Sequence, residues 1–134
     1  MRTTVENANA PDTCKTILIL EDIRIVAETL RQYLIYRLGS GYTIKVFPTM
    51  ASLLAHGLVG DVLISDLSLP DSDAYQTAAF LMSRLSTIAI VCYSSSTETG
   101  LKLEIESNGK IKYFCKSGSI EELAKHIKRT VFQS

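Results

Sequence analysis

The chain has 134 residues, and 14 basic side chains (Lys plus Arg) balance 14 acidic ones, so its formal net charge at pH 7 is zero. Hydrophobic residues make up 46% of the sequence and charged residues 21%, which is typical of one soluble globular domain. The balanced charge offers no basic field for a phosphate backbone, so we expect no direct contact with nucleic acid. No run reaches the roughly 18 continuous apolar residues of a membrane span, so no membrane partner is expected either.

The first residues differ in character from the rest of the chain. Residues 1–14 are polar and lack the apolar segment of a signal peptide, so we expect a disordered tail at 1–14 and one folded domain at 15–134. The cysteines Cys14, Cys92 and Cys115 are odd in number and form no C-x-x-C pair. Reduced thiols are favoured over a disulfide framework or a zinc site. These features together predict a cytoplasmic protein.

The first half of the domain begins with an unbroken apolar run, TILIL, which is typical of a parallel strand buried on both faces. Apolar residues at helical spacing follow it, namely Ile23, Val26, Leu30, Leu34 and Leu38, and Gly39 to Gly41 end the helix. In chain order we expect a strand at 16–20, a helix at 23–38, a strand at 43–47, a short helix at 50–58 and a strand at 61–66.

The second half continues the alternation of helices and strands. We expect a helix at 74–85, a strand at 88–93, a helix at 97–107, a strand at 111–115 and a final helix from 119 through Val131. Ser119 and Glu122 have the spacing of a capping box, in which each side chain bonds the other residue's free backbone N–H. Five strands alternating with five helices predict an α/β fold with a doubly wound parallel sheet.

The residues that follow the strands are the candidates for chemistry. In an open parallel sheet the site lies beyond the carboxyl ends of the strands, near the switch in strand order. Acidic residues follow two strands, a hydroxyl follows another and an ammonium follows the last: Glu21, Asp22, Asp66, Ser94 and Lys116. We expect these side chains to meet at one end of the sheet.

Such a group of side chains favours magnesium and phosphoryl chemistry. Three crowded carboxylates repel one another, and a hard divalent cation relieves that repulsion. Mg²⁺ prefers oxygen ligands and is commonly held by one or two carboxylates together with phosphate oxygens. Asp66 would then act as a nucleophile toward phosphorus. Lys116 would supply positive charge and Ser94 a hydrogen bond.

The chain resembles the receiver (CheY-like) domains of two-component response regulators over about residues 15 to 131. Ser94 follows Asp66 by 28 residues and Lys116 follows Ser94 by 22 residues, as in that family. The matching pieces are ILILED (17–22), ISDLSLPD (64–71), Ser94 after an apolar strand, and YFCKS (113–117). The resemblance implies a flavodoxin-like five-stranded parallel sheet with five helices in three layers.

The resemblance also implies roles for the candidate residues. Asp66 would be the phosphoacceptor. Asp22 would bind Mg²⁺ together with Asp66, Glu21 would help directly or through water, and the backbone carbonyl of Ser68 would be a further ligand. Lys116 would pair with a phosphoryl oxygen.

Further residues match positions at which the family controls its switch. Ser94 would move toward the phosphoryl group, and Tyr113 lies where the family carries an aromatic residue whose rotamer follows phosphorylation. The side chains of Ser68 and Ser96 lie where the family tunes the lifetime of the phosphoryl group.

The function that the resemblance implies is that of a signalling module. It is not an enzyme on other substrates and catalyses only its own phosphorylation and dephosphorylation. A histidine kinase or histidine phosphotransfer protein would donate the phosphoryl group, and a downstream effector protein or domain would receive the signal. A homodimer is left open.

The sequence departs from the family in three loops. Ser117 follows Lys116 where the family usually has Pro, often after a cis bond. Ala74 replaces a Gly, and residues 108–110 (NGK) replace Gly-Ala. A degenerate receiver that acts as a phosphorylation-independent interaction module therefore stays an alternative. Less favoured are a flavin-binding protein, because acids after the first strand would repel a phosphate, and an aspartyl hydrolase, because Asp66 lacks a second acid two residues on.

Overall fold

The computed structural model describes residues 15–132, so the tail predicted at 1–14 lies outside the described part of the chain. The strands are β2 (Lys15–Leu20), β3 (Tyr42–Phe47), β4 (Val62–Ser65), β5 (Ala89–Ser94) and β6 (Lys112–Cys115). The α-helices are α3 (Arg24–Leu38), α4 (Met50–His56), α5 (Ala74–Ser83), α6 (Thr97–Glu106) and α7 (Ile120–Ile127), and a π-helical segment, η1 (Lys128–Phe132), follows α7.

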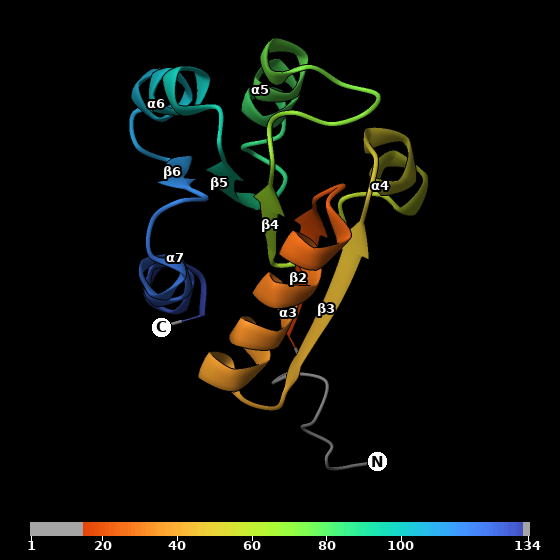
Figure 1. Ribbon diagram of the computed structural model, residues 1–134, viewed down its shortest axis with the longest axis vertical. Helices are drawn as coiled ribbons and strands as arrows, with labels where there is room; N and C mark the ends of the chain where they lie inside the picture. The colour runs from red at the N-terminus through yellow and green to blue at the C-terminus, as the bar shows by residue number, and fades with distance from the viewer. Residues whose placement is uncertain (1–14, 133–134) are drawn as a thin grey trace.

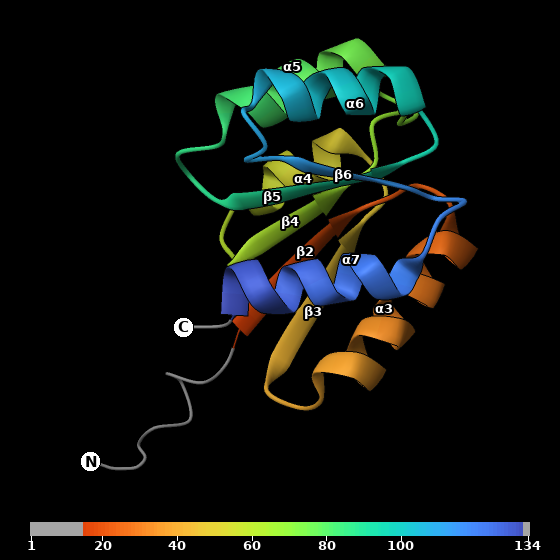
Figure 2. The ribbon, with the colours of Figure 1, turned by 90° about the vertical axis from the view of Figure 1, so that its left-hand side faces the viewer.

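All five strands form one parallel sheet in the order β3-β2-β4-β5-β6. Helices α4, α5 and α6 cover one face, and α3 and α7 cover the other, which gives three layers (Figures 1 and 2). The predicted fold class is thus confirmed. Within the described residues no helix combines the length and the apolarity needed to cross a membrane.

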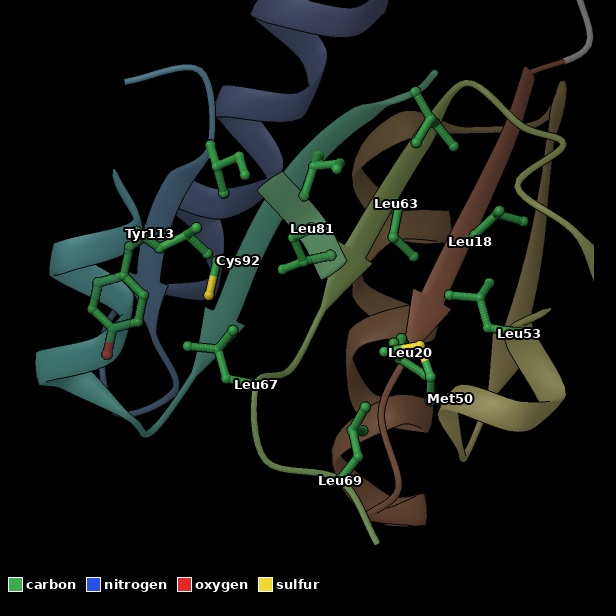
Figure 3. Close-up of a cluster of buried hydrophobic side chains, with 14 residues drawn as sticks. Leu18, Leu20, Met50, Leu53, Leu63, Leu67, Leu69, Leu81, Cys92 and Tyr113 are labelled. Carbon is green, nitrogen blue, oxygen red and sulfur yellow. The ribbon is translucent and has the colours of Figure 1, made fainter. Parts of the chain in front are cut away.

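The central strands are apolar on both sides because each face of the sheet is covered by helices. Successive side chains of a strand point to opposite faces, so β2 serves two separate cores. Leu18 and Leu20 pack into the cluster under α4, α5 and α6 (Figure 3). Ile17 and Ile19 pack into the cluster under α3 and α7. The unbroken apolar run in β2 therefore fixes the three-layer arrangement.

One residue of the predicted apolar stripe on α3 does not belong to it. Ile23 is 48% exposed, whereas Leu30 and Leu34 are fully buried. Ile23 is the N-cap residue and has extended backbone dihedral angles, so its side chain lies outside the helical periodicity. Ala27, which the predicted stripe omitted, is buried instead.

The predicted C-terminal helix is also different in detail. Its α-helical part ends at Ile127, and the backbone continues as π-helix. At its start, the Ser119 side chain accepts a hydrogen bond from the Glu122 N–H at 3.3 Å. The return bond of the predicted capping box is not among the hydrogen bonds of the described residues, and the Glu122 carboxylate lies 3.8 Å from Lys125 Nζ instead.

Candidate functional site

The switch in strand order brings the acidic residues together. The chain adds β3 on one side of β2 and β4 on the other, so the ends of β2 and β4 lie side by side. Leu20 and Ser65 are register partners, and the Asp66 N–H donates to the Leu20 carbonyl at 2.9 Å. Glu21 and Asp22 continue from Leu20, so the acids of both strands meet at this rim.

Lys116 follows the edge strand β6 and pairs with both buried acids. Its Nζ lies 2.7 Å from Glu21 Oε1 and 2.8 Å from Asp66 Oδ2. The exposed fractions of the side chains are 13% for Lys116, 2% for Glu21 and 5% for Asp66. Charges this deeply buried persist only when they are paired and hydrogen-bonded, and the ammonium does this for both carboxylates.

The second oxygen of each buried carboxylate is held by backbone donors. Asp66 Oδ1 accepts the Leu67 N–H at 2.7 Å, with the Ser68 N–H at 3.5 Å. Glu21 Oε2 accepts the Ile23 N–H at 3.1 Å. Both carboxylates are therefore held in one orientation by the turns that follow their own strands.

Burial and the shared ammonium shift the pKa values of Glu21 and Lys116. Burial raises the pKa of Glu21 above its ordinary value, and this outweighs the lowering by the hydrogen bond from Lys116 and by the Ile23 N–H. Burial alone would lower the pKa of Lys116, but its hydrogen bonds to Asp66 and Glu21 outweigh burial and raise it. Burial therefore opposes the charged form of Glu21, whereas two carboxylate partners favour the charged form of Lys116.

The acidic group suits a divalent cation. Ligand oxygens of Glu21, Asp22 and Asp66 all lie within 4.8 Å of one another, with Asp22 exposed at the rim and the other two buried. Every available donor is a hard oxygen, and the local charge is negative even with Lys116 in place. This donor set fits Mg²⁺, which takes oxygen ligands and keeps several waters on its exposed side.

A cavity of about 260 Å³ opens directly above the acids. It brings together predicted residues from four strand ends, because Asp22, Asp66, Ser94 and Lys116 all line it. The other lining residues are Ile23, Ser68, Ser95 and Ser96. Of the predicted site residues, Glu21 and Tyr113 do not line the cavity. Glu21 forms an ion pair with Lys116, and the Tyr113 hydroxyl donates to the Ser94 carbonyl.

Ser94 is fully buried at the end of β5. Its Oγ accepts the Ser96 N–H at 3.1 Å, and its carbonyl accepts the Lys116 N–H at 3.2 Å. Because Oγ acts here as an acceptor, its own hydrogen stays available to an acceptor in the cavity. Ser94 is thus linked both to the cavity and to the strand that carries Lys116.

Tyr113 lies on β6 with its ring directed inward against α6. Its hydroxyl donates toward the Ser94 carbonyl at 3.0 Å and lies 3.2 Å from Thr97 Oγ1. The ring packs on Gly100, where a Cβ would overlap the ring atoms. Sequence reasoning missed Thr97 and Gly100, since a Thr and a Gly in a polar helix carry no signal of such a contact.

The departure at Ser117 leaves Lys116 in place. No cis peptide bond occurs within residues 15–132, so the Lys116–Ser117 bond is trans, which is the low-energy form before a non-proline residue. The turn closes through the Gly118 N–H, which donates to the Cys115 carbonyl at 2.9 Å. Lys116 still reaches both buried carboxylates from this trans loop.

The other two departures also fit the fold. Ala74 is the first residue of α5 and does not have a positive φ, so this position does not need glycine. Between α6 and β6, Asn108 and Gly109 adopt φ values of 56° and 78°. Asn and Gly are the residues that enter this left-handed region most easily, so the replacement forms a normal turn.

The comparison with known proteins rests on structure alone. No family model matches the sequence, and no curated protein matches it. The structure is similar to a response regulator receiver (CheY-like) domain from Methanospirillum hungatei, with a TM-score of 0.69 and 20% identity over 87% of this chain and 92% of that one.

Two further solved structures give the same result. The receiver domain of HemR from Leptospira biflexa matches with a TM-score of 0.71 and 18% identity over 90% of this chain and 96% of that one. A response regulator from Chloroflexus aurantiacus, whose assignment as such is provisional, matches with a TM-score of 0.69 and 24% identity over 90% and 99%. These matches cover nearly the whole described chain and nearly all of each neighbour. The chain therefore has the fold of the receiver (CheY-like) domains of response regulators.

Proposed function

We propose that this chain is the phosphoacceptor module of a two-component phosphorelay, with Asp66 as the acceptor. The observation that carries the proposal is the meeting of Asp66, Asp22 and Lys116 at one cavity, although they follow three different strands. A lone acceptor carboxylate beside a cation site and an ammonium is the arrangement that phosphoryl transfer to a carboxylate needs.

The transfer is a displacement at phosphorus. An Asp66 carboxylate oxygen forms a bond to the phosphorus of a phosphohistidine, the P–N bond breaks, and its electron pair stays on the imidazole nitrogen. Charge on the phosphoryl oxygens has to be offset while this happens. Lys116 can leave Asp66 to contact one phosphoryl oxygen, and the Ser94 hydroxyl can donate to another.

Asp22, Asp66 and the carbonyl of Ser68 would hold Mg²⁺, and Glu21 would help directly or through water. When bound, this ion supplies the positive charge that the acids and the phosphoryl oxygens together require. The residues of the chain do the positioning: the Leu67 N–H fixes Asp66, and the Ile23 N–H fixes Glu21. The module acts only on its own phosphoryl group and is not an enzyme on other substrates.

The output would be a change in protein binding. Movement of the Ser94 hydroxyl toward the phosphoryl group would alter the Ser94–Tyr113 contact, because the Tyr113 hydroxyl bonds the Ser94 carbonyl. Repacking of Tyr113 against α6 would then shift the population of two states of the α6 and β6 surface. The side chains of Ser68 and Ser96 border the cavity and would influence how fast water removes the phosphoryl group.

The partners that this function requires are a histidine kinase or a histidine phosphotransfer protein as donor, and an effector protein or domain as receiver of the signal. Such a pathway places the protein in the cytoplasm. One of the matched solved structures is the BeF3-activated receiver domain of DrrB, which has a TM-score of 0.68. The same reagent offers a way to mimic phosphorylation of Asp66 in this chain.

A degenerate receiver is the second candidate, and the Ser117 replacement is the observation that favours it. Such a module would bind its partners through the α6 and β6 surface without any phosphoryl group. The contact of Lys116 with Asp66 is retained, and this supports the phosphoacceptor function over the degenerate receiver.

Magnesium dependence separates the two candidates. In the presence of Mg²⁺, acetyl phosphate should add the mass of one phosphoryl group to the intact protein, and a chelator should prevent this. The Asp22→Asn variant should need about tenfold more Mg²⁺ for the same rate, since a neutral amide replaces one carboxylate ligand. Glu122→Gln, an exposed acid on α7, is the matched control and should respond like the wild type. Absence of any adduct at saturating Mg²⁺ would favour the degenerate module.

A further inference from the structure

The loop after Asp66 is tied to a neighbouring helix by one carboxylate. The Met50 N–H donates to Asp71 Oδ1 and the Ala51 N–H donates to Asp71 Oδ2, both at 2.9 Å. These donors belong to the first turn of α4, where backbone N–H groups have no partner inside the helix. The same two bonds, from Ala51 and Met50, lower the pKa of Asp71 from its ordinary value.

Asp71 occupies the tip of a tight turn. The Leu69 N–H donates to the Ser72 carbonyl at 2.9 Å, and the Ser72 N–H donates back to the Leu69 carbonyl at 3.4 Å. Pro70 and Asp71 are the two central residues, and proline suits the first of these because its φ is already set. The turn therefore projects the Asp71 carboxylate toward α4.

Ser68 lies directly between the acceptor and this turn. It lines the cavity beside Asp66, and its N–H is 3.5 Å from Asp66 Oδ1, which is a weak contact. On its C-terminal side, Leu69 is buried in the same apolar cluster as Met50 of α4. The loop and the start of α4 thus contribute to one apolar cluster, and the Asp71 carboxylate bonds them directly.

The other end of the loop is fixed independently. Asp73 caps α5 by accepting the Gln76 N–H at 2.8 Å, and the Ser72 and Thr77 hydroxyls lie 2.8 Å apart. Both of these contacts hold the loop to α5. Among the hydrogen bonds of the described residues, those of Asp71 are the ones that join this loop to α4.

We infer that Asp71 is a positioning residue for the metal site, holding the loop against α4 so that the Ser68 carbonyl stays beside the acids. This inference rests on the function proposed above. Mg²⁺ demands near-ideal octahedral geometry, so a ligand on a loop that shifts must be ordered again each time the ion binds. Asp71 provides that order in advance.

Calorimetric titration of the unphosphorylated protein with MgCl₂ tests this inference. Asp71→Ala should weaken Mg²⁺ binding by about tenfold, the lower end of the range for residues that support metal ligands. Asp71→Asn keeps one acceptor oxygen and should fall between Asp71→Ala and the wild type. Thr49→Ala is the matched control, because it removes another cap of the same helix, the Thr49 side chain that accepts the Ser52 N–H at 3.0 Å, without touching the loop.

The outcomes separate the possible failures. Weaker binding in Asp71→Ala, with Thr49→Ala within about twofold of the wild type, supports the positioning role. An equal loss in both variants, or in neither, overturns it, because Asp71 would then only cap α4 or do nothing for the metal. Wild-type protein that binds no Mg²⁺ contradicts the proposed function itself, and the inference falls with it. Urea unfolding of each variant confirms that the proteins compared are folded.

Discussion

The Asp66→Asn variant is expected to accept no phosphoryl group from acetyl phosphate while keeping its fold. The amide cannot serve as the nucleophile, so the adduct should fall below detection in the intact mass. The fold should survive because the introduced amide retains an oxygen for the Leu67 N–H and Lys116 retains Glu21. Loss of the bond to Lys116 is offset by removal of one carboxylate from a cluster with excess negative charge. The free energy of unfolding should therefore change by less than about 1.5 kcal/mol.

Asp61→Asn is the matched control for this variant. Asp61 and Asp66 flank the same strand, β4, at opposite ends, and Asp61 Oδ2 accepts the Thr16 N–H at 2.8 Å. This variant loses a charge from the strand but none from the cavity, so it should be phosphorylated like the wild type. An adduct that forms in Asp66→Asn at the wild-type rate would rule out Asp66 as the acceptor.

Replacement of Lys116 by methionine should have the largest effect on stability. Methionine keeps an unbranched apolar stem but leaves the buried carboxylates of Glu21 and Asp66 without a cation. Breaking a buried ion pair from one side costs about 3–5 kcal/mol. The phosphorylation rate should fall about 100-fold, as when one preorganised electrostatic donor is removed from a reaction site.

The stability deficit of Lys116→Met should depend on pH in a defined direction. Burial already raises the pKa of Glu21, and loss of the ammonium raises it further. A carboxyl group whose pKa is higher in the folded than in the unfolded state stabilises the fold at low pH, and that stabilisation is lost as the pH rises through the folded-state value. The deficit should therefore be largest near neutral pH and should shrink as the pH falls toward the ordinary range of a glutamate.

Urea unfolding at several pH values, in a chelator and in Mg²⁺, measures this effect. Lys125→Met is the control, since Lys125 lies on α7 with its side chain 44% exposed and its ion-pair partners among the described residues are the exposed acids Glu121 and Glu122. That exposed variant should change the free energy of unfolding by less than about 1 kcal/mol. A Lys116→Met protein as stable as Lys125→Met would mean that the ammonium is not what compensates the two buried carboxylates.

Much of the fold followed from the apolar pattern of the sequence. The strands predicted at 16–20 and 111–115 begin within one residue of β2 and β6. For β2 the reason is that a continuous apolar run is typical of a strand covered on both faces of a parallel sheet. The meeting of Asp22, Asp66 and Lys116 was predicted from the same pattern, since parallel strands end at a common rim. Side-chain orientation beyond a helix end was not predictable in this way, and Ile23 was assigned to the wrong environment for that reason.

The contacts that support the site lay beyond sequence reasoning. Aspartate is common in turns, so Asp71 carries no signal of its own. Its partners in α4 are 20 and 21 residues away in the chain. The sequence gives no reason for a glycine at position 100, and the structure shows that the Tyr113 ring packs where its Cβ would be. These roles arise from the packing of separate segments, which only the three-dimensional arrangement reveals.

Chemical mapping of the modified residue tests the central claim most directly. Borohydride reduces an acyl phosphate to an alcohol, so an aspartyl phosphate becomes homoserine. After treatment of the wild-type protein with acetyl phosphate and Mg²⁺, reduction and peptide mass spectrometry should find homoserine at position 66. Reduction at Glu21, Asp22 or a site remote from the cavity, with position 66 unchanged, would contradict the account.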